Sequence, residues 1–188
     1  MDTPSPKGVY DPDTVARGGT NADTLNDLLR DLPVAIDKES VPSTWNREAH
    51  VLELEPDLIV IHRSAFFHAL NAEFGFGYAP FPDEQTKTRW RLLYRAGDDK
   101  LASFLGLIGS LNPVTKFLVY SRGTSPEWAD SEYRRHWVTG LEQRFPALAG
   151  RISTLAIAGG VEHGSFADLR VMRQIRGSIE AALDLPKR

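Results

Sequence analysis

Three polar residues, His62, Arg63 and Ser64, follow directly on an unbroken apolar run at positions 58–61. An imidazole takes up or releases a proton near neutral pH, and a serine hydroxyl becomes a nucleophile when such a base lies within about 3 Å. The planar fork of an arginine matches a carboxylate or a phosphate. The residue types at this position are therefore suited to acyl transfer or to binding an anion.

Four further candidates, Lys38, Arg122, Glu162 and His163, come shortly after other apolar segments of the chain. If those segments are parallel strands, their ends converge with His62 and Arg63 on one rim of the sheet, where ligands of such folds bind. A group of cations there would bind a carboxylate, sulfate or phosphate. The alternative is that the cations pair with neighbouring carboxylates and hold loops in place.

A catalytic version of this site needs a nucleophile, a base and a group that orients the base. Ser64 is the candidate nucleophile, and His163 or His62 is the candidate base. Glu162 or Asp168 could orient the ring of His163. The alternative is structural: a serine after a strand commonly caps a helix, and a loop histidine often bonds to backbone.

The elements that must position these residues follow from hydrophobic patterning. The run at 58–61 does not alternate with polar residues, which predicts a strand covered on both faces, as in a parallel sheet between helices. Further strands are predicted at 9–10, 34–36, 117–120 and 152–157, and helices at 21–32, 43–54, 65–70, 83–108 (interrupted near 97–99), 126–145 and 168–183. Strands alternating with helices predict a three-layer α/β sandwich.

The length of 188 residues is enough for one domain with a single core. Residues 1–8 are rich in proline and serine and are predicted to be a disordered leader. A single α/β domain is therefore expected over residues 9–188.

The order of motifs resembles that of the SGNH/GDSL hydrolases. The sequence VPSTW at 41–45 precedes EPDLIVI at 55–61, and GVEHGS at 160–165 precedes a predicted helix that begins near Asp168. The resemblance covers roughly 34–64 and 115–185. It implies a flavodoxin-like sheet of five mostly parallel strands, hydrolysis of ester bonds, and His163 as the catalytic histidine.

The chain departs from the pattern of that family at three places. The Gly-Asp-Ser motif is absent near 11–14, HRSA at 62–65 replaces Gly-x-Asn-Asp, and Gly160 stands where the aspartate before His163 is expected. The resemblance therefore implies one of two things. The domain is either a degenerate member that binds a ligand without catalysis, or an esterase or deacylase with a rearranged site.

Composition excludes several other classes. The net charge of −3 and the pI near 6.0 argue against a nucleic-acid partner or an anionic membrane surface, and no apolar run approaches a membrane span. Without cysteine there are no disulfides or thiolate ligands, and His62 and His68 lack the spacing of paired helical ligands. No metal and no cofactor are predicted, and the composition fits cytoplasm and periplasm equally.

A non-enzymatic module on a flavodoxin-like fold remains the alternative. The aromatic Gly/Pro loop from Phe74 to Phe81 could contact a protein partner. Gly18-Gly19, together with the arginines, could instead hold a phosphate or a nucleotide.

Overall fold

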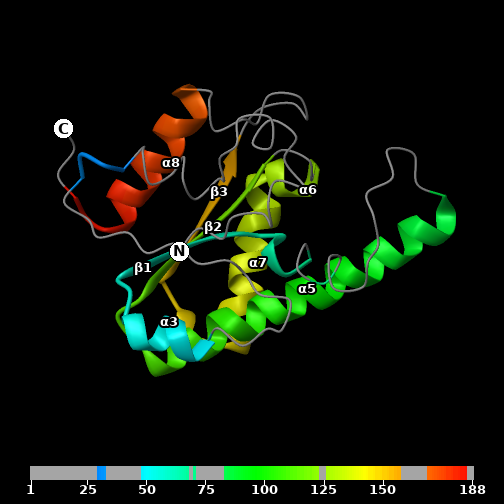
Figure 1. The fold of residues 1–188 in the computed structure, drawn as a ribbon, viewed down its shortest axis with the longest axis horizontal. Helices are drawn as coiled ribbons and strands as arrows, with labels where there is room; N and C mark the ends of the chain where they lie inside the picture. The colour runs from blue at the N-terminus through cyan, green and yellow to red at the C-terminus, as the bar shows by residue number, and fades with distance from the viewer. Residues whose placement is uncertain are drawn as a thin grey trace.

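A computed structural model describes residues 29–32, 48–67, 70, 83–122, 126–157 and 169–185 (Figure 1). Several predictions lie outside the described residues: the leader 1–8, the strands at 9–10 and 34–36, the glycine pair at 18–19 and the aromatic loop at 74–81. Among the sites predicted from the sequence, Lys38, Glu162 and His163 also lie outside them.

Three strands form a parallel sheet in the order β1-β2-β3: β1 (Leu58–His62), β2 (Lys116–Arg122) and β3 (Ile152–Ile157). Ile59 pairs with Phe117, which in turn pairs with Ile152. The predicted strands at 58–61, 117–120 and 152–157 are confirmed, and so is the mixed α/β class. The described residues form three strands, and the sheet of five that the resemblance implies stays a prediction.

Helices cover both faces of this sheet. Successive side chains of a strand point to opposite faces, so each strand contributes to both cores. One face packs against α3 (Glu48–Leu54), α5 (Glu84–Leu111), α6 (Pro126–Ala129) and α7 (Ser131–Arg144). The opposite face packs against α8 (Leu169–Ala182) and residues 29–32. Figure 1 shows α8 separated from α5 and α7 by the strands. Ile59, Ile61, Phe117 and Val119 face the first group, and Val60, Leu118 and Tyr120 face α8.

The long helix α5 has no break, so the interruption predicted near 97–99 is wrong. Asp83 caps the helix as expected, since its side chain accepts a hydrogen bond of 2.7 Å from the Thr86 backbone N–H. Gly97 is a contact residue instead of a helix breaker. A Cβ at this position would lie 2.7 Å from the backbone nitrogen of Phe67, so glycine lets the two segments approach.

The predicted helix at 126–145 is two helices. Asp130 lies between α6 and α7, and its carboxylate accepts the Glu132 backbone N–H at 2.8 Å, which starts α7. A short 3-10 helix, η2 (Pro146–Leu148), then leads to β3. Trp128 and Leu148 are buried in the core.

The last helix buries a stripe of the kind the sequence predicts. Ile175 and Ile179 are each 2% exposed, and Leu183 packs beside them. Asp168, the predicted cap, lies outside the described residues. Over the described ranges, no helix combines the length and the apolar character needed to cross a membrane.

Candidate functional site

The carboxyl ends of the strands lie together, which places several of the predicted residues along one edge of the sheet. His62 ends β1 and Arg122 ends β2, and these strands are parallel neighbours. The backbone N–H of Arg63 extends the pairing by donating to the Tyr120 carbonyl at 2.8 Å. Ser64 follows in the turn after β1. We call this the carboxyl edge.

His62 turns toward the α8 face of the sheet. Its ring meets the ring of Tyr120 edge to face, with centroids 5.0 Å apart, and Tyr120 belongs to the core beneath α8. Its Nδ1 accepts the backbone N–H of Ser64 at 3.1 Å. The ring proton of the neutral imidazole is therefore on Nε2, and Nδ1 holds the turn after β1.

Arg63 turns to the opposite face, toward the helices α5, α6 and α7. Its guanidinium lies 3.2 Å from a carboxylate oxygen of Asp98 and donates to the Tyr133 hydroxyl at 3.1 Å. It also lies over the ring of Trp128, 4.9 Å from the centroid. The Arg63 side chain is 12% exposed. Although His62 and Arg63 are adjacent in sequence, their side chains enter different layers of the molecule.

Electrostatics distinguish this arrangement from an ordinary surface ion pair. Burial raises the pKa of Asp98, while the charge and hydrogen bond of Arg63 act in the opposite direction without reversing the shift. Glu127 and Asp99 add smaller raising effects. Burial also raises the pKa of Tyr94, whose ring stacks on Phe67 at 3.7 Å. The protonated form of Asp98 is thus favoured more in the folded protein than in water.

The backbones of His62, Arg63, Ser64 and Arg122 lie along one edge, but the side chains of His62 and Arg63 point to opposite faces of the sheet. The structure tests neither the role of Ser64 nor the roles of the residues outside the described ranges, which stay predictions. Within the described ranges, no group of three or more carboxylate or imidazole side chains is arranged to hold a metal ion.

Sequence reasoning missed Asp98, Tyr133 and Trp128 as partners of Arg63. A signal was present for Asp98, because it stands three residues before Leu101 and seven before Leu105, at the margin of the buried stripe of α5. A carboxylate in that position on a helix faces the domain and needs a partner. No sequence pattern links it to a residue at the end of β1.

The amino edge of the sheet, where β2 and β3 begin, holds a second half-buried arginine. Arg151 immediately precedes β3, and its Nη1 donates to the carbonyls of Asn112 at 2.9 Å and Thr115 at 3.1 Å. Its Nη2 reaches the Gly109 carbonyl, and its Nε donates to Ala147 at 2.8 Å. These carbonyls include some at the end of α5 that have no partner within the helix, so Arg151 closes α5 and joins it to η2.

No family model matches this chain, and neither a curated protein nor a solved structure matches it. The arguments about function therefore come from the chain itself.

Proposed function

We propose that this protein is an SGNH-hydrolase-like α/β domain that binds a small anionic or acylated ligand at the carboxyl edge without turning it over. The observation that carries the proposal is the parallel pairing of β1, β2 and β3, which gathers His62, Ser64 and the end of β2 at the edge where such sheets bind ligands.

The placement of α8 supports the five-stranded, flavodoxin-like form of this fold. The last helix packs on the face opposite α5 and α7, against residues 29–32. Arg176 of α8 pairs with both carboxylate oxygens of Asp31 and with Glu180. A flavodoxin-like sheet places its first and last helices together on one face in this way, and the predicted first helix ends at residues 29–32.

One contact argues against His62 as the base that would activate Ser64. A base that activates Ser64 must offer an unprotonated nitrogen to the hydroxyl, whereas Nδ1 of His62 already accepts the backbone N–H of that residue. Arg63 is held by Asp98 and Tyr133, so its charge stabilises the turn that presents His62 and Ser64. In the proposal, the ligand binds beside the ring of His62, and Arg122, Lys38 and His163 supply the charge that attracts it.

The test measures binding and turnover on the same protein. Thermal unfolding is followed with sulfate, phosphate, acetate and butyrate, and hydrolysis is followed with p-nitrophenyl butyrate. We expect at least one anion to raise the midpoint in a saturable way, and we expect no hydrolysis above a heat-denatured sample. The His62→Ala variant should lose the stabilisation.

His136→Ala is the matched control, because His136 lies on an exposed part of α7 with a side chain 67% exposed. It should keep the full stabilisation. Hydrolysis that disappears with Ser64→Ala or His163→Ala would replace the proposal by a rearranged esterase. If no anion shifts the midpoint and no ester is cleaved, the proposed site is wrong.

A further inference from the structure

The outer turns of α5 form a basic surface that the proposed ligand site does not use. We call residues 84–95 the basic segment. It contains Lys87, Arg89, Arg91 and Arg95 against one acidic residue, Glu84, a formal charge of +3 in a chain whose total is −3. The rest of the chain is therefore acidic, and positive charge is concentrated on three turns of one helix.

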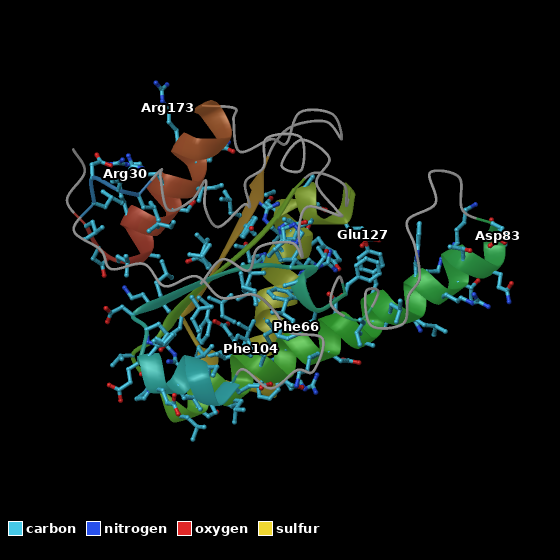
Figure 2. All side chains as sticks on the ribbon, in the orientation of Figure 1. Arg30, Phe66, Asp83, Phe104, Glu127 and Arg173 are labelled. Atoms are coloured by element: carbon cyan, nitrogen blue, oxygen red, sulfur yellow. The ribbon has the colours of Figure 1, made fainter. Side chains whose placement is uncertain are left out.

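All four basic side chains of the segment are exposed. In Figure 1 this end of α5 reaches past the sheet, and Figure 2 shows side chains extending into the surroundings on several sides of the helix near Asp83. Lys87, Arg91 and Arg95 are spaced by four residues, so they form one stripe along the helix. Lys87 pairs with Glu84 at 2.6 Å, so a partner lying along α5 would meet chiefly Arg91 and Arg95.

Apolar side chains are exposed among these charges. Leu92 is 61% exposed, whereas Tyr94, although 44% exposed, stacks its ring on Phe67 at 3.7 Å. The helix already has an inner apolar contact, because Leu93 and Trp90 pack with Phe67 in a small cluster. Leu92 is therefore additional to the residues that attach the helix to its own domain. Arginines around an exposed apolar side chain are typical of a protein interface.

We propose that the basic segment binds an acidic polypeptide, whose carboxylates meet Arg91 and Arg95 and whose apolar side chain covers Leu92. The positive charge of the segment favours a negatively charged partner, and the exposed Leu92 favours one that also carries apolar side chains. A nucleic acid fits less well, because it offers no aliphatic side chain to cover Leu92. A membrane surface fits less well too, because an in-plane helix inserts its apolar face into lipid, whereas Leu93 and Trp90 pack on Phe67.

Fluorescence anisotropy tests this with a labelled peptide of glutamate, leucine and tyrosine, and with a second peptide in which lysine replaces glutamate. The full chain should bind the acidic peptide, release it as salt is added, and ignore the lysine peptide. Arg91→Glu combined with Arg95→Glu should raise the Kd by at least about tenfold, which corresponds to about 1.4 kcal/mol. Leu92→Ser should raise it as well, by a smaller factor and without changing its salt dependence.

The matched control is Arg135→Glu combined with Arg173→Glu, which makes the same charge change at exposed positions on α7 and α8. This variant should bind the acidic peptide nearly as the parent does, and both double variants should keep the parent's thermal midpoint. Three results would overturn the proposal: no binding of the acidic peptide, equal loss in the two double variants, or tighter binding to duplex DNA or to phosphatidylserine vesicles than to the peptide.

Discussion

Arg151 at the amino edge of the sheet and Arg63 at its carboxyl edge are both half-buried arginines that tie the sheet region to α5. They differ in what they contact. Arg151 donates to backbone carbonyls such as those of Asn112 and Thr115, which are fixed, neutral dipoles in need of a donor. Arg63 contacts the carboxylate of Asp98, a group that must lose part of its hydration to be there.

The difference shows which edge is built for stability. Each hydrogen bond from Arg151 satisfies an acceptor that the fold itself creates, so the contact stabilises the domain. The Arg63–Asp98 pair carries a burial cost for the carboxylate that its attraction to Arg63 does not overcome, since the pKa of Asp98 stays raised. Groups with shifted pKa values gather at functional sites more often than elsewhere.

Among the variants considered, Arg151→Ala should have the largest effect on the free energy of unfolding. We expect a loss of about 3 kcal/mol in the free energy of unfolding, because several carbonyls at the end of α5 lose a charged donor at once. Urea denaturation measures the change. Arg135→Ala, at an exposed pair with Glu132, should change it by less than about 0.5 kcal/mol. Equal effects in the two variants would contradict the role assigned to Arg151.

Two glycines of α5, one beside each arginine, allow the stability of the two edges to be compared by the same substitution. Gly97→Ala should cost about 2 kcal/mol, because the new Cβ meets the backbone of Phe67 at 2.7 Å and would push Asp98 away from Arg63. Gly109→Ala should cost less, about 1 kcal/mol, because its Cβ would meet side chains instead of backbone: the buried terminal carbon of Leu148, and Nη2 of Arg151 at 2.9 Å.

Gly140→Ala is the control for both glycine variants. Nothing lies within 4 Å of a Cβ at this position of α7, so only helix propensity should act, a gain of about 0.5–1 kcal/mol. Thermal or urea unfolding of the three variants under the same conditions checks the order. If Gly97→Ala proves as mild as Gly109→Ala, the close approach of α5 to Phe67 is wrong.

A smaller effect is expected from Tyr133→Phe, which removes the hydroxyl that accepts from Arg63 at 3.1 Å. The loss should be about 0.5–1 kcal/mol, because Asp98 and the ring of Trp128 still contact the guanidinium. Chemical denaturation gives the value. A loss as large as that of Arg151→Ala would mean that the two edges contribute equally to stability.

The smallest expected effect is a pH dependence that isolates Asp98. The folded protein binds the Asp98 proton more tightly than the unfolded chain does, since burial raises this pKa above the ordinary value of 3.8. The contribution of Asp98 to stability is therefore greatest below pH 3.8 and falls as the pH rises through the folded pKa. Solvent limits its size, because the side chain is 37% exposed.

The measurement is the difference in unfolding free energy between the parent and Asp98→Asn over the acid range. The parent should lose stability relative to the variant as the pH increases from 3.8. A difference that grows in favour of the parent would show that attraction to Arg63 outweighs burial, and the contrast with Arg151 would then disappear.

The sequence predicted the strands well because their signals are local. The apolar run at 58–61 and the segments at 117–120 and 152–157 each became a strand with nearly the expected bounds. The failure at Gly97 has an equally plain cause. Glycine breaks helices through its intrinsic freedom, but here the identity of the residue is decided by contact with Phe67, some thirty residues earlier in the chain.

The candidate site was predictable only in part. Parallel strands place His62 and Ser64 at a common edge, and this follows from patterning alone. The division of His62 and Arg63 between two layers depends on Tyr120 on one side and on Asp98 and Tyr133 on the other. The residues in those contacts are between thirty-five and seventy positions apart, so the hydrophobic periodicity of the sequence cannot predict them.

The unbroken length of α5 has a mechanical consequence. Its 28 residues make a rod of about 42 Å, with Asp98 near the middle and the arginines of its outer turns near one tip. The carboxylate that contacts Arg63 and the arginines of the outer turns are therefore carried by one continuous element.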